Sequence, residues 1–138
     1  MELYLDDSIY NQINLLCRYG DMFFNNERYD EAVKKYDEAL LLLPYPQEQW
    51  DAFVWIAVAK GDAFFFDRKY DKALVQYSLA MNADEATTNP YIYMRLGEAY
   101  YENNNYLLAR KYIQAAYKID KNVFVDTDTK YLQILKGE

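Results

Sequence analysis

The sequence contains no histidine and a single cysteine, Cys17. Without histidine, Ser–His triads, imidazole acid–base catalysis and histidine metal sites are excluded. One cysteine cannot form an intramolecular disulfide, and we expect Cys17 to be a small buried apolar side chain. The four glycines form no phosphate-binding loop. Catalysis by carboxylates alone remains as an alternative, but no pair is singled out by spacing. We therefore predict a non-enzymatic protein with no cofactor and no metal.

Long apolar runs and positive charge are also scarce. No apolar run approaches the roughly 20 residues that a membrane-spanning helix needs, and the first residues, MELYLDDS, lack the features of a signal peptide. The net charge is -7, with a pI near 4.6. Binding to nucleic acid or to anionic lipid draws on clustered Lys and Arg. We expect a soluble cytoplasmic protein whose partners are basic or neutral proteins rather than nucleic acid or membrane.

A fourteen-residue pattern occurs three times in the chain. In each copy a glycine is followed by an acid and then by two adjacent aromatic residues. The copies are YGDMFFNNERYDEA at 19–32, KGDAFFFDRKYDKA at 60–73 and LGEAYYENNNYLLA at 96–109. Aligned on Gly20, Gly61 and Gly97, they are spaced by 41 and 36 residues. Such a period indicates a repeat protein.

Further positions recur on both sides of each glycine. Aromatic residues stand three and nine positions after it: Phe23, Phe64, Tyr100, and Tyr29, Tyr70, Tyr106. Alanines stand twelve and nineteen positions after it: Ala32, Ala73, Ala109, and Ala39, Ala80, Ala116. Other apolar residues stand sixteen after and five before it: Tyr36, Tyr77, Ile113, and Leu15, Ile56, Ile92. These offsets are helical on either side of a polar break, so each unit is predicted to be a helix pair. Glycine and alanine would let the two helices approach closely.

The pattern resembles the tetratricopeptide repeat family, and YMRLGEAYYENNNYLLARKYIQAAYKID at 93–120 matches its signature best. The resemblance departs in the longer period, and only Pro44 supplies the closing proline. It implies an all-α, right-handed superhelix of antiparallel helix pairs. We expect one domain over 1–138, with three units at about 7–45, 46–86 and 88–121.

The extra residues of the period predict longer first helices. DDSIYNQINLLCRYGDMFF in unit one and PQEQWDAFVWIAVAKGDAFFF in unit two each read as one long helix, because about seven extra residues amount to two turns. Pro46 suits the first turn of the second. After residue 122 the pattern changes, and we expect a terminal helix at about 126–137. It is either a solvating cap or part of a fourth repeat with an apolar edge left for another chain.

Two repeated positions have no role in the predicted packing of the helix pairs. They are the acid after the glycine and the second aromatic, and helical geometry turns both away from the packed side. In the resembling family this surface is the concave groove that binds segments of partner proteins. The predicted partner-binding residues on it are Asn14, Arg18, Asp21, Phe24, Trp55, Asp62, Phe65, Tyr91, Arg95, Glu98 and Tyr101. The alternative is a solvated face with the local ion pairs Arg18–Asp21 and Arg95–Glu98.

One subfamily of these repeats clamps the acidic tails of heat-shock chaperones with basic and Asn residues. Here Cys17, Asp21 and Tyr91 stand where the clamp needs Lys, Asn and Lys, and only Arg95 is kept. An acidic groove would also repel an acidic tail. We do not predict this function.

The sequence therefore predicts a non-catalytic protein-interaction module, an adaptor or scaffold, with a groove that is aromatic and acidic. Its partner would be a protein or peptide carrying basic and apolar residues. One alternative is a chaperone-like or immunity-type protein that sequesters a secreted protein or toxin. Another is a structural homo-oligomer formed through the C-terminal edge.

Overall fold

The structure is a computed structural model and describes residues 4–136. It contains only helices, turns and irregular segments over that range. The α-helices are α1 (Asp7–Asn25), α2 (Tyr29–Leu41), α3 (Asp51–Phe66), α4 (Tyr70–Ala80), α5 (Pro90–Glu102), α6 (Tyr106–Ile119) and α7 (Thr129–Gln133). Three short 3-10 helices connect them: η1 (Gln47–Gln49), η2 (Asp84–Thr88) and η3 (Lys121–Phe124). The all-α fold class is as predicted.

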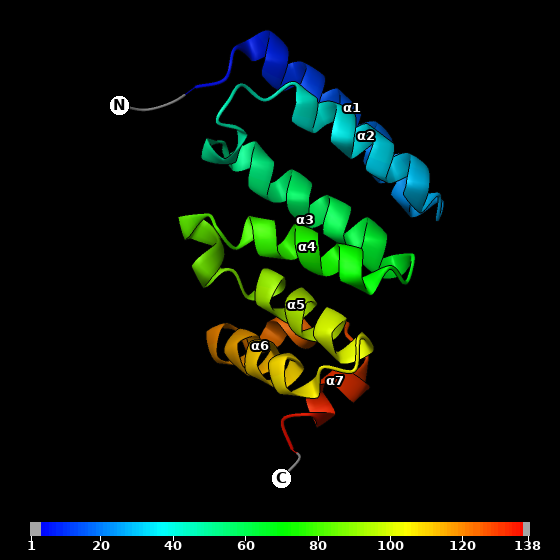
Figure 1. Cartoon of the computed structure of the whole chain (residues 1–138), viewed down its shortest axis with the longest axis vertical. Coiled ribbons are helices and arrows are strands. Elements are labelled where there is room, and N and C mark those ends of the chain that lie inside the picture. Colours follow the sequence, from blue (N-terminus) through cyan, green and yellow to red (C-terminus); the bar gives the residue numbers. More distant parts are fainter. Residues whose placement is uncertain (1–3, 137–138) are drawn as a thin grey trace.

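The helices form three antiparallel pairs stacked in chain order, with the two ends of the chain at opposite ends of the long axis (Figure 1). Within the pairs, α1 packs on α2, α3 on α4 and α5 on α6. Between the pairs, α2 packs on α3 and α4 packs on α5. The surface that α1, α3 and α5 form on the side away from their paired helices is called the first-helix face below.

The repeated glycines lie where the two helices of each pair cross. A Cβ atom added to Gly20 or Gly61 would meet the ring of Tyr36 or Tyr77 at 2.5 Å. The same atom on Gly97 would meet Ile113 at 2.5 Å. The six repeated alanines are all fully buried. The prediction that small residues permit close helix packing is confirmed.

Each pair turns through a residue in the left-handed region. These residues are Glu27, Arg68 and Asn104, with φ values of 62°, 62° and 63°. Each stands seven positions after its glycine, within the polar breaks that the sequence pattern placed between the helices. The backbone conformation of the turn is therefore the same in all three units, although the residue at this position differs.

The long first helix predicted for unit two is shorter than expected. Helix α3 begins at Asp51, and the preceding residues form η1. Trp50 separates them because its backbone is extended, with φ of -96° and ψ of 138°, and its indole Nε1 donates to the carbonyl of Pro44 at 2.9 Å. Pro46 comes before η1 rather than in the first turn of α3. Helix α1, with 19 residues, has the predicted length.

The C-terminal segment also differs from the expected helix at 126–137. Helix α7 has five residues, and residue 137 lies outside the described residues. Asp128 caps α7 by accepting a hydrogen bond from the backbone of Lys130 at 3.0 Å. Before it, η3 packs on α5 and α6 and buries Phe124. The segment therefore folds back over unit three instead of extending the array as a full helix.

None of the described helices is long and apolar enough to cross a membrane.

Candidate functional site

The acids that follow the glycines have partners inside the array. Asp21 accepts a hydrogen bond from the hydroxyl of Tyr36 at 2.6 Å, and Asp62 accepts one from Tyr77 at 2.5 Å. In both units the donor is the tyrosine sixteen positions after the glycine. The expectation that these acids have no part in internal packing was therefore wrong for Asp21 and Asp62.

The second aromatic residues have repeated partners too. Phe24, Phe65 and Tyr101 each form an edge-on ring contact with the tyrosine nine positions after the glycine of their unit, at centroid distances of 5.5, 5.3 and 5.2 Å. Phe65 is buried, with 8 % of its surface exposed, whereas the rings of Phe24 and Tyr101 are half-buried. These rings therefore pack within the first-helix face rather than project from it.

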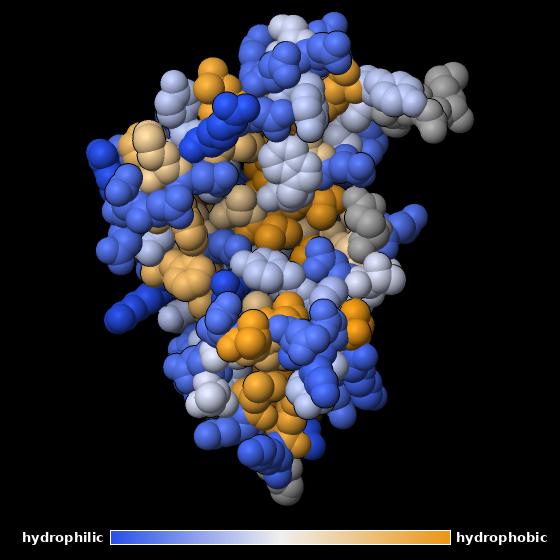
Figure 2. All heavy atoms as spheres, turned by 180° about the vertical axis from the view of Figure 1, so that it is seen from behind, coloured by the Kyte–Doolittle hydropathy of each residue, from blue (hydrophilic) through white to orange (hydrophobic). Residues whose placement is uncertain are grey.

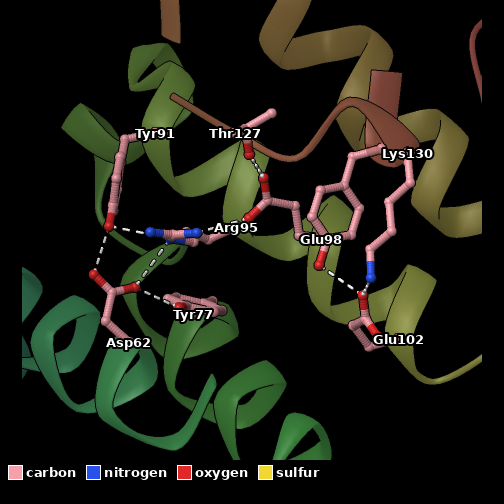
Figure 3. Close-up of polar contacts among 9 residues, drawn as sticks. Asp62, Tyr77, Tyr91, Arg95, Glu98, Glu102, Thr127 and Lys130 are labelled. Atoms are coloured by element: carbon pink, nitrogen blue, oxygen red, sulfur yellow. Dashed lines mark hydrogen bonds and ion pairs between the residues drawn. The ribbon is translucent and has the colours of Figure 1, made fainter. Parts of the chain in front are cut away.

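A cluster of polar side chains lies where units two and three meet. Isoleucine replaces tyrosine at position 113, so Glu98 lacks the donor that Asp21 and Asp62 have. Glu98 is fully buried and accepts hydrogen bonds from Arg95, at 2.7 Å, and from the hydroxyl of Thr127. Arg95 also lies 3.4 Å from Asp62 and donates to the hydroxyl of Tyr91 at 3.1 Å. Figure 3 shows Arg95 between the two carboxylates, with Tyr91 and Tyr77 around Asp62. We call this set, Asp62, Tyr77, Tyr91, Arg95, Glu98 and Thr127, the Arg95 cluster.

The Arg95 cluster holds one cation against two carboxylates in a largely dry setting. Burial raises the pKa of Asp62 and of Glu98, and the neighbouring Arg95 only partly opposes this. Burial alone would lower the pKa of Arg95, but Asp62, Tyr91 and Glu98 outweigh it and keep the guanidinium charged. The guanidinium also lies over the rings of Phe66, Tyr91 and Phe65, at 5.0, 5.1 and 5.3 Å from their centroids. The cluster is therefore a rigid, charge-paired element with an excess of negative charge.

A hollow of about 370 Å³ opens beside the Arg95 cluster. Helices α3 and α5 form one side of it, and the C-terminal segment forms the other with Val123, Asp126 and Tyr131. The residues on the helical side are Phe65, Phe66, Tyr91, Met94, Arg95 and Glu98. Phe66 is 45 % exposed, and Asp126 is exposed as well. We call it the C-terminal hollow. Its walls combine aromatic rings with carboxylates.

A second hollow of about 460 Å³ lies between the beginnings of α1 and α3. Trp55, which is 39 % exposed, lines it together with Trp50, Tyr10 and the acids Asp7 and Asp51. The structure therefore divides the predicted groove, because Trp55 faces a different hollow from Phe65 and Tyr91. In the space-filling view, apolar side chains gather in the middle of the face opposite to that of Figure 1 and again near the C-terminal end (Figure 2).

The predicted binding residues are thus distributed unevenly. Those that line the C-terminal hollow are Phe65, Tyr91, Arg95 and Glu98. Those that line neither of these two hollows are Asn14, Arg18, Asp21, Phe24, Asp62 and Tyr101. Of the two local ion pairs considered, Arg95–Glu98 forms, but no Arg18–Asp21 pair occurs among residues 4–136.

Several residues of the C-terminal hollow were missed by the sequence pattern. Thr127 and Tyr131 come from the segment that follows the repeats, and nothing in the repeat indicates where this segment lies. One signal was available, because the Tyr-to-Ile change at position 113 leaves Glu98 in need of another donor. Tyr131 similarly donates to Glu102 at 2.6 Å, beside the Lys130–Glu102 ion pair at 2.8 Å (Figure 3).

Cys17 is not a candidate for chemistry. Its side chain is 8 % exposed, and burial raises the pKa of its thiol to about 12. The thiol therefore stays protonated at neutral pH, as expected for a structural residue. Within the part of the chain that the structure describes, no group of three or more acidic or thiol side chains is arranged to hold a metal ion.

Comparison with known proteins gives matches at the level of the repeat and of the fold. Residues 90–123 match the family model described as tetratricopeptide repeat. A search of curated protein sequences finds no significant match. Among solved structures, the first such domain of Spaghetti (RPAP3), bound to the HSP90 peptide SRMEEVD, has a TM-score of 0.73 at 19 % identity, covering 99 % of this chain and 100 % of that one.

Two further structures are similar over most of their length. The Yersinia enterocolitica type III secretion chaperone SycD, in complex with a peptide of the translocator YopD, has a TM-score of 0.73 at 16 % identity, covering 91 % of each chain. The NMR structure of the first domain of human RPAP3 has a TM-score of 0.72 at 20 % identity, covering 91 % of this chain and 93 % of that one. These likenesses extend the repeat match at residues 90–123 to the architecture of the whole array.

Proposed function

We propose that the chain is a non-catalytic interaction module that binds a segment of another protein on its first-helix face, since residues 90–123 match the tetratricopeptide repeat and the whole chain has the fold of such domains. The observation that carries the proposal is the C-terminal hollow, where exposed aromatic and acidic side chains surround a rigid polar cluster. Two structures with this fold, Spaghetti (RPAP3) and SycD, hold peptides. We place this binding in the cytoplasm and assign it no cofactor.

The chemistry of the C-terminal hollow favours a partner with a basic residue next to an apolar one. The apolar side chain would pack against Phe66 and Met94, and the basic one would approach the carboxylate of Asp126. The Arg95 cluster adds a second attraction, because its two carboxylates outnumber its one cation. The net charge of -7 would speed the approach of a basic segment. An acidic peptide such as SRMEEVD does not fit this chemistry.

Selection from a displayed random peptide library tests this preference. We expect the wild-type chain to enrich sequences that combine Lys or Arg with large apolar residues. Enrichment of acidic peptides, or of none, would contradict the proposal. Fluorescence anisotropy with a selected peptide then gives dissociation constants for wild-type and variant chains.

Two variants of the hollow, each with a matched control, locate the site. Phe66→Ala should weaken binding about tenfold, since a partly exposed aromatic anchor contributes roughly 1–2 kcal/mol, whereas Leu107→Ala, at a position 82 % exposed, should not. Asp126→Lys should weaken binding and reduce its salt dependence, whereas the same change at the exposed Asp71 of α4 should leave affinity nearly unchanged. Equal losses in a variant and its control would exclude the C-terminal hollow.

A chaperone-like or immunity-type role is a second candidate, supported by the fold shared with SycD. It would use the same surface but would act by keeping an apolar segment of a secreted protein or toxin in solution. Light scattering of an aggregating client peptide, with and without one equivalent of the chain, separates this role from simple binding. An adaptor would leave the aggregation rate of unrelated apolar peptides unchanged.

Self-association through the C-terminal edge is a third candidate. A hollow of about 630 Å³ lies there between Tyr117 of α6 and the residues Leu132 and Leu135. The segment that forms it buries Phe124 and Tyr131 to 4 % and 7 % exposure, so this edge is already partly covered by the chain itself. We therefore rank it below peptide binding.

A further inference from the structure

The outer side of α1 carries an apolar stripe. The equivalent positions in units two and three lie in the interface with the preceding helix pair. The stripe consists of Leu15, Tyr19 and Met22, which are 49 %, 46 % and 49 % exposed. They lie within about 60° of one another around the helix, at about 100° per residue. The stripe is therefore one continuous surface and not three scattered residues.

The equivalent positions in units two and three are covered by the preceding helix pair. In α3 they are Ile56, Lys60 and Ala63, and in α5 they are Ile92, Leu96 and Ala99. The apolar members of both sets are at most 2 % exposed. Lys60 reaches back to Asp37 of α2 at 2.6 Å, which shows directly that this side meets the second helix of the unit before. Helix α1 has no such helix upon it in the described structure, yet it keeps apolar residues at all three positions.

We propose that this stripe is the interface of a homodimer, in which α1 packs antiparallel on α1 of a second copy. Within the described residues, 4–136, no helix of this chain lies on the stripe. The occupant that we propose is therefore another molecule.

Charge and symmetry favour a second copy as that molecule. The helical positions on and beside the stripe, from Ser8 to Asn26, hold no carboxylate, although the chain has a net charge of -7. They are Ser8, Asn11, Gln12, Leu15, Arg18, Tyr19, Met22 and Asn26. Two such faces can meet without the repulsion that the rest of the surface would cause. An antiparallel pairing centred between Arg18 and Tyr19 sets Leu15 of one copy opposite Met22 of the other, so the stripe is self-complementary as a two-fold interface requires.

The test is the mass of the full chain in solution over a concentration series, by analytical ultracentrifugation. We expect a rise from 16.5 kDa toward twice that value below about 1 mM. The variant Leu15→Glu with Met22→Glu should raise the dissociation constant at least tenfold. The matched variant Leu41→Glu with Val75→Glu, which adds the same charge at positions 78 % and 57 % exposed, should not.

A thiol placed next to the expected two-fold axis tests the geometry. Tyr19→Cys should form an intermolecular disulfide under mild oxidation by copper phenanthroline in air, whereas Leu41→Cys should stay largely monomeric under the same conditions. A chain that is monomeric at every concentration would overturn the proposal and leave the stripe to a helix of another protein. A dimer that survives the α1 variants but is lost in Leu135→Glu would overturn it in favour of the C-terminal edge. None of these outcomes depends on peptide binding to the C-terminal hollow.

Discussion

Arg95 is the central residue of the polar contacts in unit three. Its side chain is 15 % exposed and lies between Asp62 of unit two and Glu98 of its own helix. A buried charge network of this kind adds little to stability compared with well-packed apolar residues, but breaking it is costly because unpaired charges remain. The network therefore acts mainly to hold the second and third units in one arrangement beside the C-terminal hollow.

Replacing Arg95 should cause a pH-dependent loss of stability. Both neighbouring carboxyls have raised pKa values in the folded chain, so the folded state binds protons more readily than the unfolded one. Stability therefore falls as the pH rises through these pKa values. Arg95→Met removes the opposing cation and raises both pKa values further. We expect the free energy of unfolding to drop by about 3 kcal/mol at pH 7 and by less at pH 5.

Urea unfolding at the two pH values measures this difference. Arg18→Met is the matched control, since Arg18 stands at the same repeat position, two before the glycine, and is exposed. Its effect should stay within about 0.5 kcal/mol at both pH values. A loss for Arg95→Met that is the same at pH 5 and pH 7 would show that the two carboxyls do not titrate as inferred.

At the scale of elements, the helix pairs are joined by three turns of the same backbone shape. Left-handed φ values are costly for residues with a Cβ atom, by roughly 1 kcal/mol, and least so for Asn. The chain places Glu27, Arg68 and Asn104 there, so only the third turn has a favourable residue. The sequence pattern located these breaks but gave no sign of the left-handed residue, since no glycine marks it.

Arg68→Gly should stabilise the chain, because glycine adopts the left-handed conformation without steric cost. We expect a gain of about 0.5–1 kcal/mol in the free energy of unfolding. Arg68→Ala removes the same side chain but keeps the Cβ atom, so it should give no gain. Thermal unfolding followed by circular dichroism distinguishes the two variants, and equal behaviour would mean that the strain does not reside in this φ angle.

At the scale of the whole molecule, each unit packs mainly on its neighbours, and the two ends of the described structure differ. The C-terminal end is covered by a segment of the chain that buries Phe124, whereas the stripe on α1 is open. In such arrays stability is close to a sum of units and interfaces, and a local change acts mostly on nearby units. The C-terminal segment should therefore support unit three far more than unit one.

Phe124→Ala tests this coupling. Truncation of a buried phenylalanine costs about 3–5 kcal/mol, and we expect amide hydrogen exchange to speed up in α5 and α6 well before α1 and α2. Val125→Ala changes the adjacent residue, which is 81 % exposed, and should alter neither stability nor exchange. Uniform loss of protection over all helices would indicate a single cooperative unit instead.

Much of the fold could be predicted from the sequence because its causes are local and repeated. Each glycine and the residue sixteen positions after it pack within a single helix pair, so their spacing alone reveals the contact. The beginning of α3 was misplaced for the opposite reason. It depends on how Trp50 lies against the backbone of Pro44, and the repeat contains no equivalent of that contact.

The candidate site depends on contacts that the sequence repeat does not predict. Glu98 and Thr127 are 29 residues apart and meet only because the C-terminal segment folds back onto α5. The repeated pattern could indicate that an acid and an aromatic ring lie on the first-helix face. Whether they are exposed or already engaged is determined by neighbours from other units. The period thus specifies how each helix pair packs, whereas the partners of Glu98 and the exposure of α1 follow from how the pairs and the C-terminal segment assemble in three dimensions.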